Sequence, residues 1–357
     1  MISGKAKEYS TKQVIGLITP FVLTVVFLFL AFRNVEFSKT AELVSEASIK
    51  WMLAFVLMFF FSHFLRAVRW KVMLQSVKKD LSIRNLFGAV MIGYGVNCAV
   101  PRLGEVYRAF FLGKWENLSR TSMLGTVIVE RIIDIISLLL SVLVSIYVYN
   151  GNLLIEIEWL SSALFIVGIA IAALILFLIA LVFFREKVSS VILKGVGKFS
   201  GKAADKLNHI FEMLTNGFST IKSAKSLSVT LFLSVFIMVV YGINSYIGLL
   251  MLHMDTMQPV NLSMGWVLMT IAAFGIVLPT PGGTGSYHII TKLTLVGLYG
   301  FSENISLAYA FLTHIIAYVL FVASTIMVVF LSNVRLRREG KEKVNFISVF
   351  KNNSDEI

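Results

Sequence analysis

The sequence predicts an all-α polytopic membrane protein, and three observations lead to this fold class. Of its 357 residues, 57% are hydrophobic and only 15% are charged, a balance typical of integral membrane proteins rather than of globular domains. Apolar runs of the length that a membrane-spanning helix needs, about 20 residues, recur along the chain. Two further apolar stretches are interrupted by proline and glycine, as re-entrant hairpins are. We therefore expect about six full transmembrane helices and two re-entrant broken hairpins.

Six apolar runs are predicted to be the full spans. They lie at residues 14–32, 51–76, 119–148, 159–184, 227–252 and 305–331. The first run resembles a signal peptide, but it is long for one and no small-residue cleavage site follows it. We therefore interpret it as an uncleaved span.

The distribution of basic residues predicts the orientation. A formal net charge of +12 could suggest a nucleic-acid partner, but here Lys and Arg gather in loops and at helix ends, as cytoplasmic topology signals do. The connections 149–158 and 253–261 contain neither residue, whereas 185–225 is strongly basic. The alternative for this basic loop is a surface that binds anionic lipids. We expect a multi-pass protein of the cell (inner) membrane with one transmembrane domain at 13–335, both termini cytoplasmic, and cytoplasmic segments at 1–12, 185–225 and 336–357.

Two pairs of short apolar segments predict the re-entrant hairpins. The first pair, 86–100 and 103–112, meets at a break that contains Asn97, Pro101 and Gly104. The second pair, 262–277 and 289–298, meets at a break rich in proline and glycine that contains Pro279, Pro281, Gly282, Gly283, Gly285 and His288. Each segment is too short to cross a bilayer. Irregular backbone at membrane depth is tolerated only where it is buried in protein or lines a cavity.

The order span, broken hairpin, span occurs twice along the chain. The two leading spans are three crossings apart, so the copies would face opposite ways. Paired interrupted segments of this kind point to the binding site in transporters. We therefore predict an inverted repeat whose two breaks form gates on opposite sides of the membrane. The alternative is a coincidence of helix lengths.

Eight charged residues in apolar surroundings are candidates for binding a lipid headgroup. They are Arg66 and Arg69 in the second span, Arg102, Glu105 and Arg108 after the first break, and Glu130, Arg131 and Asp134 in the third span. Charges inside a membrane are costly and usually face the bundle interior or a water-filled cavity, and the start of a half-helix favours an anion. The spacing predicts that Glu105 pairs with Arg102 or Arg108 and that Glu130 and Asp134 share a helix face. The alternatives are snorkelling of Arg66 and Arg69 to lipid phosphates and a purely structural ion network.

The second break offers hydroxyls and backbone amides in place of charge, and such amides can hold an anion without a cation. His288 is interpreted as a satisfied polar residue rather than a proton carrier. No metal or cofactor is expected, because the chain has one cysteine and its five histidines lack metal-ligand spacing. The glycine-rich break also lacks the G-K-[ST] ending of a nucleotide-binding loop. Because no catalytic arrangement is recognisable, we do not expect an enzyme.

Four motifs occur in order along the chain and together resemble one family. They are Arg66-x-x-Arg69-Trp70, Asn97-x-x-x-Pro101-Arg102-x-Gly104-Glu105-x-x-Arg108, Glu130-Arg131-x-x-Asp134 and Pro279-x-Pro281-Gly282-Gly283-x-Gly285. The resemblance, over about residues 10–335, is to the flippase-like transmembrane region of lysylphosphatidylglycerol synthases. It implies a lipid-flipping domain with re-entrant helices, which in the full-length synthases moves aminoacylated phosphatidylglycerol to the outer leaflet. A separate cytoplasmic domain makes that lipid, and we expect this chain to lack it. His288 stands where many relatives have glutamate.

These observations predict a flippase that moves a lipid with an anionic headgroup or a polyprenyl-phosphate-linked lipid across the inner membrane. No ATP motif is present, so a gradient or diffusion would drive it. One alternative is the membrane part or accessory subunit of a lipid-modifying transferase that acts in aminoacyl- or glycosyl-lipid synthesis. Another is a non-transporting scaffold for a separate synthase. The expected partners are membrane lipids, a separate synthase or transferase, and further copies of the chain.

Overall fold

The computed structural model describes residues 11–75, 77–157 and 224–350, together with a few single positions between 158 and 223. Most of the predicted span 159–184 and nearly all of the basic loop 185–225 lie outside the described residues. Every regular element in the described ranges is helical, which confirms the all-α class.

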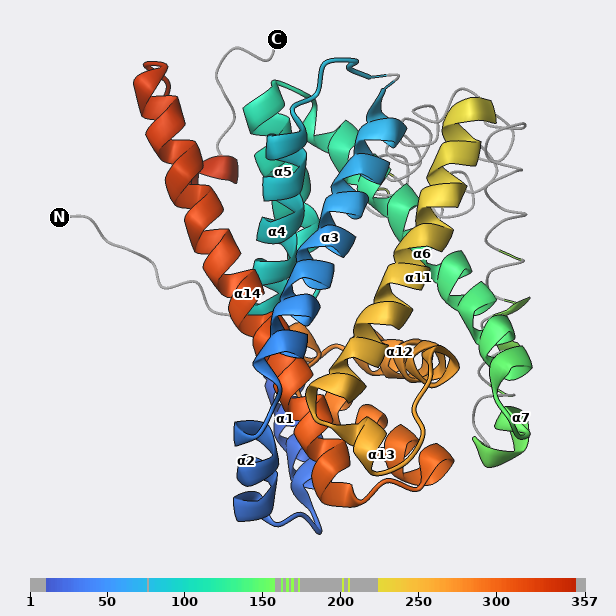
Figure 1. The fold of residues 1–357 in the computed structure, drawn as a ribbon. Helices are drawn as coiled ribbons and strands as arrows, with labels where there is room; N and C mark the ends of the chain where they lie inside the picture. The colour runs from blue at the N-terminus through green and yellow to red at the C-terminus, as the bar shows by residue number, and fades with distance from the viewer. Residues whose placement is uncertain are drawn as a thin grey trace, which may run out of the picture.

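The described chain forms eleven α-helices and three short 3₁₀ turns (Figure 1). The α-helices are α1 (Thr11–Phe32), α2 (Phe37–Ser45), α3 (Ile49–Leu74), α4 (Ile83–Ala99), α5 (Gly104–Glu116), α6 (Arg120–Val148), α7 (Leu153–Glu156), α11 (Ala224–Met251), α12 (Leu262–Val277), α13 (Ser286–Tyr299) and α14 (Glu303–Arg338). The 3₁₀ turns are η1 (Met254–Thr256), η2 (Pro281–Gly283) and η3 (Ser348–Phe350).

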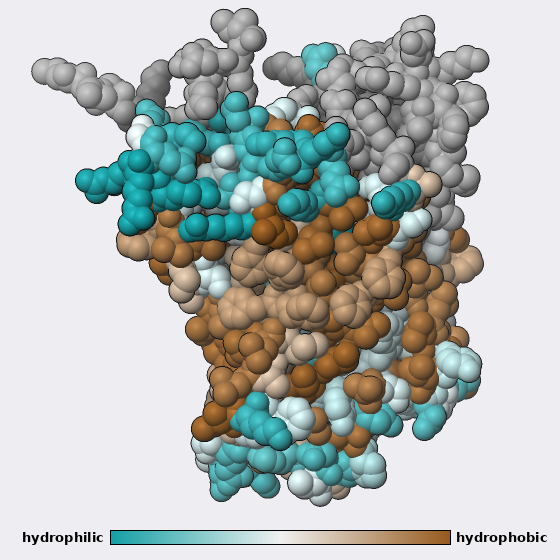
Figure 2. Space-filling view, turned by 45° about the horizontal axis from the view of Figure 1, so that its top comes forward, coloured by the Kyte–Doolittle hydropathy of each residue, from teal (hydrophilic) through white to brown (hydrophobic). Residues whose placement is uncertain are grey.

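Several of these helices suit a membrane. Among the described residues, α3, α11 and α14 are long and apolar enough to cross one, and α1 with α2 forms a fourth candidate that is bent by 88°. Helix α6 has 29 residues but carries the charges Glu130, Arg131 and Asp134. Figure 2 shows a broad hydrophobic band between two hydrophilic ends, as expected of a surface that faces lipid. The chain is therefore a multi-pass membrane protein.

The structure departs from the predicted elements at several places, and one of them is the short helix α7, which lies in the predicted connection 149–158. Residues 33–50, which lie between the predicted spans 14–32 and 51–76, contain the helix α2, whose Leu43 and Val44 pack against a buried core. The last helix continues to Arg338, seven residues past the predicted end at 331. Its last turn holds Arg335, Arg337 and Arg338, and cations at a helix C-terminus interact favourably with the helix dipole.

The two broken hairpins are present, as α4 with α5 (the first hairpin) and α12 with α13 (the second hairpin). Glycine lets the arms of each hairpin touch. A Cβ added to Gly104 would lie 1.8 Å from the backbone oxygen of Gly93, and one added to Gly275 would lie 2.8 Å from that of Ser286. In Figure 1 the first hairpin lies toward the end of the molecule that holds the C-terminus of α14, and the second lies toward the opposite end.

The tips of the two hairpins meet. Arg102, at the first tip, donates from Nη2 to the backbone oxygen of Val277 at the end of α12, at 3.1 Å. A Cβ added to Gly282, at the second tip, would lie 3.3 Å from the Cα of Cys98. The two breaks therefore form one contact, made by hairpins that lie toward opposite ends of the molecule, and their role as gates on opposite sides of the membrane stays a prediction. The inverted repeat itself stays a prediction.

Helix α1 packs on the second hairpin. Its backbone passes so close to Gly285 that an added Cβ there would lie 2.8 Å from the oxygen of Thr24. Lys292 of α13 is 4% exposed and donates to the oxygens of Ala31 and Arg33, at 3.0 and 2.9 Å. This ammonium group satisfies carbonyls at the end of α1 that lack an intrahelical partner.

Candidate functional site

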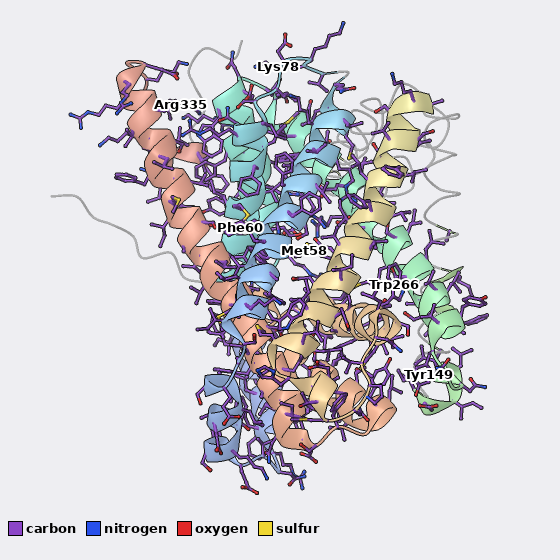
Figure 3. The ribbon with its side chains drawn as sticks, in the orientation of Figure 1. Met58, Phe60, Lys78, Tyr149, Trp266 and Arg335 are labelled. Carbon is purple, nitrogen blue, oxygen red and sulfur yellow. The ribbon has the colours of Figure 1, made fainter. Side chains whose placement is uncertain are left out.

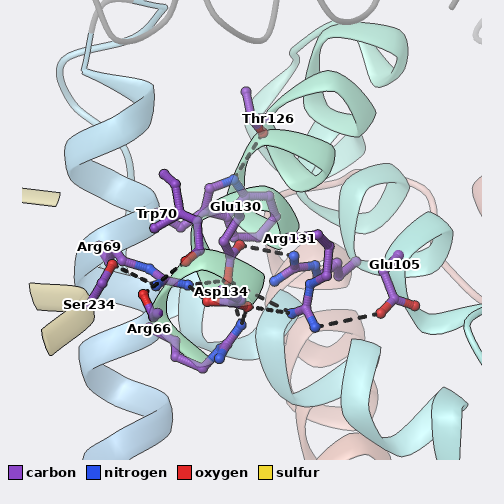
Figure 4. A network of polar contacts seen from close by, with 12 residues as sticks. Arg66, Arg69, Trp70, Glu105, Thr126, Glu130, Arg131, Asp134 and Ser234 are labelled. Atoms are coloured by element: carbon purple, nitrogen blue, oxygen red, sulfur yellow. Dashed lines mark hydrogen bonds and ion pairs between the residues drawn. The ribbon is translucent and has the colours of Figure 1, made fainter. Parts of the chain in front are cut away.

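A buried set of ion pairs joins α3 to α6 (Figure 4). Arg66 and Arg69, one turn apart on α3, both point at Glu130 and Asp134, which are one turn apart on α6. The Nη2 atoms of the two arginines lie 2.8 and 2.9 Å from Glu130 Oε1, and Arg69 Nη2 also lies 2.6 Å from Asp134 Oδ1. Both arginines are therefore buried in protein, and the alternative that they snorkel to lipid phosphates is wrong.

Helix α5 supplies a third cation to these ion pairs. Arg108 Nη2 lies 2.9 Å from Glu130 Oε2, so Glu130 has three arginines within 3 Å. The guanidinium of Arg108 stacks over the ring of Trp70 with 5.0 Å between its Cζ and the ring centre. Trp70 is held in turn, because its Nε1 donates to Thr126 on α6 at 3.0 Å. We call the five charged side chains the ion network: Arg66, Arg69, Arg108, Glu130 and Asp134.

The ion network is deeply buried and carries one excess positive charge. The exposed fraction is 4% for Arg66, 0% for Arg69 and Glu130, 3% for Arg108 and 14% for Asp134. Buried charges are tolerated when each is paired and hydrogen-bonded. Two carboxylates cannot neutralise three guanidinium groups. Arg131, 3.5 Å from Asp134, and Glu105, 3.9 Å from Arg131, add one charge of each sign, so the surplus of one cation remains.

Glu105 and Arg131 form a looser pair at the edge of the ion network. Their closest charged atoms lie 3.9 Å apart, and the side chains are 25% and 37% exposed. Glu105 also accepts from Asn97 Nδ2 at 3.3 Å. We predicted that Glu105 pairs with Arg102 or Arg108, which is wrong. Glu130 draws Arg108 inward, and Arg102 precedes α5 with a left-handed φ of 63°, so helical spacing does not apply to it.

Arg102 lies apart from the ion network. It is exposed, and its hydrogen bond to Val277 joins it to the second hairpin. Asn97 has a local role at the first tip, since its Oδ1 accepts from the backbone N–H of Gly104 at 2.8 Å and satisfies an N–H at the start of α5. The structure therefore gathers seven of the eight predicted charges into one region.

Beside Arg108 is a small pocket of about 10 Å³, room for about one water molecule. Its lining residues are Val90, Gly93, Tyr94, Asn97, Gly104, Glu105, Arg108 and Arg131. The Nε, Nη1 and Nη2 groups of Arg108 are buried and make no hydrogen bond, although Nη2 forms the ion pair with Glu130. Unsatisfied buried donors are costly, and these N–H groups keep the capacity to donate to a further acceptor.

The second break holds itself together through side chains. Ser286 Oγ contacts the backbone oxygen of Gly275 at 2.6 Å and Thr280 Oγ1 at 2.9 Å. His288 accepts the backbone N–H of Gly285 with its Nδ1 at 3.2 Å. His288 thus stabilises the start of α13.

Sequence reasoning missed several residues that contact the site. Ser234 and Tyr241 of α11 accept from Arg69 and Arg66, at 2.9 and 3.4 Å. Tyr94 of α4 lies under Arg66 and stacks on Phe321 of α14. These are ordinary side chains in apolar helices. Among these residues, only Tyr94 could have been found from the sequence, because it lies one helical turn before Asn97, a residue of the predicted first break. Among the described residues, no group of three or more His, Cys, Asp or Glu could hold a metal.

Comparison with known proteins shows the family of the chain. A family model described as the lysylphosphatidylglycerol synthase transmembrane region matches residues 17–324, which include the ion network and both breaks. The chain belongs to this family. Similar proteins include a UPF0104 membrane protein of Methanocaldococcus jannaschii, 24% identical over 87% of this chain and 92% of its own length. A UPF0104 membrane protein of Pyrococcus horikoshii is 30% identical over 32% of this chain and 35% of its own length.

Proposed function

We propose that the protein is a lipid flippase that binds the anionic headgroup of a phospholipid or a polyprenyl-phosphate-linked lipid. The observation that carries this proposal is the buried surplus cation of the ion network, together with the unsatisfied N–H groups of Arg108. Arginine presents a planar fork of donors that matches phosphate oxygens. A phosphate at Arg108 would neutralise the surplus charge and satisfy these donors in one step.

The position of Arg108 supports a transport site. It lies in the second turn of α5, the half-helix that starts at the first tip, and the start of a helix attracts anions. Interrupted helices that meet near the middle of a membrane are the usual place for a transporter's substrate. The nearby contact of Arg102 with Val277 connects this site to the second hairpin.

A pocket of about 10 Å³ is too small for a phosphate group, which has four oxygens, so transport needs the site to open. Opening would separate α5 from α4 or α6, and alternating access is achieved by such movements of one group of helices against another. A gradient or simple diffusion would supply the direction.

The orientation of the molecule is part of the proposal. Lys78 and Arg335 lie at one end of the structure and Tyr149 at the other (Figure 3). The end with the basic residues would face the cytoplasm under the positive-inside rule, with the C-terminus on that side. The charged site would then be reached from the cytoplasmic leaflet through the first hairpin.

The test is a flipping assay in proteoliposomes that contain fluorescent phosphatidylglycerol, with a membrane-impermeant quencher added outside. We expect Arg108→Gln to lower the flipping rate about tenfold or more, because a charge-assisted hydrogen bond contributes about 1.5–3 kcal/mol. The matched control is Arg338→Gln, which removes an exposed arginine at the end of α14. Equal rates for the wild type and Arg108→Gln would refute the site, and a wild-type rate equal to that of protein-free vesicles would refute transport of this lipid.

A second candidate function comes from the description of the family, which names the membrane region of a synthase. In that case the protein would be the membrane subunit of a lipid-modifying transferase, or a scaffold for a separate synthase. Wild-type vesicles would then move no lipid. A modified lipid detected by mass spectrometry only when a copurifying protein is present would favour this candidate.

A further inference from the structure

The chain turns back after α14 and packs against the first hairpin. This segment, residues 341–350, is called the strap, and it includes η3 beside α5 (Figure 1). Val344 and Val349 of the strap are 2% and 0% exposed and belong to one buried cluster with Ile92 of α4 and Phe111 of α5. A surface tail would leave these side chains in water, so the strap is an integral part of the packing.

The strap contacts residues of α5 that come just before and just after Arg108 in the sequence. Phe350 lies with its ring centre 5.1 Å from those of Tyr107 and Phe110. Phe346 lies 5.5 Å from Tyr107 and 5.6 Å from Phe111. Aromatic pairs at these separations contribute beyond the area that they bury. The residues before and after Arg108 are therefore held from outside the hairpin.

The strap is anchored to α14 at its other end. The side chain of Asn333 donates to the backbone oxygen of Val344 at 3.0 Å and accepts from its N–H at 2.8 Å. Lys114 at the end of α5 donates to the backbone oxygen of Ser348 at 3.4 Å. The strap thus fixes the distance between α5 and α14. It lies beyond residues 17–324, the range that the family model matches.

We propose that the strap is a latch that keeps the pocket at Arg108 closed, and that its release frees α5 to open that pocket. The pocket is bounded on one side by α5 through Gly104, Glu105 and Arg108. The strap contacts neighbouring residues of the same helix. While these contacts are intact, they hold α5 against α4 and prevent the movement that would widen the pocket. The expectation that release of the strap speeds lipid movement rests on the proposed function. The expectation that release opens the pocket does not.

The first experiment measures opening without any lipid transport. Val90 lines the pocket and is 0% exposed, so Val90→Cys in a Cys98→Ala background gives a single thiol that a small water-soluble reagent reaches only when the pocket opens. The release variant is Val349→Asp, which puts a charge at a buried position of the strap. The matched control is Ile347→Asp, which makes the same change at a strap position that is 78% exposed.

We expect Val349→Asp to speed labelling at position 90 about tenfold or more, because a buried unpaired charge forces the strap off, and Ile347→Asp to label at the wild-type rate. Labelling at the wild-type rate in Val349→Asp would overturn the latch. If Val349→Asp fails to fold in detergent, the double change Phe346→Ala with Phe350→Ala weakens the strap more gently and is read in the same way.

The flipping assay separates this proposal from the proposed function. If the latch exists and the protein transports lipid, Val349→Asp raises the flipping rate above the wild type and Ile347→Asp does not. Faster labelling with no lipid movement in any variant would retain the latch and refute the transport function. Lipid movement in the wild type with unchanged labelling would refute the latch alone.

Discussion

Glu130→Gln tests whether the ion network stabilises the fold as the structure indicates. Glu130 is fully buried and contacts Arg66, Arg69 and Arg108 at 2.8–2.9 Å. Neutralising it leaves three buried guanidinium groups with one carboxylate, Asp134. Removing one partner of a buried ion pair costs about 3–5 kcal/mol, because the remaining charge is uncompensated. At roughly 2 °C per kcal/mol for a chain of this size, the melting temperature should fall by about 6–10 °C.

The assay is thermal unfolding in detergent, followed by intrinsic tryptophan fluorescence, to which Trp70 beside Arg108 contributes. The control is Glu105→Gln, the same change at a carboxylate that is 25% exposed and 3.9 Å from its cation. Such a pair contributes less than about 1 kcal/mol, so the shift should stay within about 2 °C. Equal shifts in melting temperature for the two variants would show that burial does not determine how much the ion network stabilises the fold.

Two further predictions concern the hairpin tips. Gly285→Ala should lower the free energy of unfolding by more than about 2 kcal/mol, because φ is +87° and the new Cβ would meet the α1 backbone. Gly297→Ala, in open space within α13, should instead be neutral or stabilising by up to about 1 kcal/mol, and chemical denaturation of both variants checks this. Arg102→Gly relieves a left-handed φ of 63° but removes the contact with Val277. The melting temperature of this variant should change by less than about 2 °C. Backbone hydrogen exchange over residues 278–284 should become faster. Unchanged exchange would mean that another contact holds the two tips together.

The helix boundaries were predictable where side-chain chemistry ends a helix locally. The second hairpin's first arm was predicted at 262–277 and is found at Leu262–Val277. Asn261 accepts the N–H of Met264 at its start, and Leu278, the residue before Pro279, is forced out of the helical region at its end. Helix α2 was missed because its nine residues are too few and too polar to form a span, although they are amphipathic, and packing of its apolar face on the core makes it helical.

The candidate site was predictable in its members and not in its pairings. Glu130 and Asp134 were predicted to share a helix face, and both contact Arg66 and Arg69. The pairs between helices, such as Arg108 with Glu130, depend on how α5 packs against α6, which no local spacing encodes. The meeting of the two tips was missed for the same reason, since sequence gives the place of each break along the chain but not its depth.

Helix α14 runs along both hairpins and makes side-chain contacts with each tip. His314 shares a hydrogen bond with Thr284 at 3.2 Å, and one turn later Tyr318 donates to the backbone oxygen of Cys98 at 3.1 Å. A slide of α14 along its own axis would disturb both contacts together, since they are made by the same rigid rod. A ligand that binds at the first hairpin and favours one position of α14 would then shift the conformation of the second hairpin by the same free energy. A ligand at the second hairpin would shift the first hairpin equally.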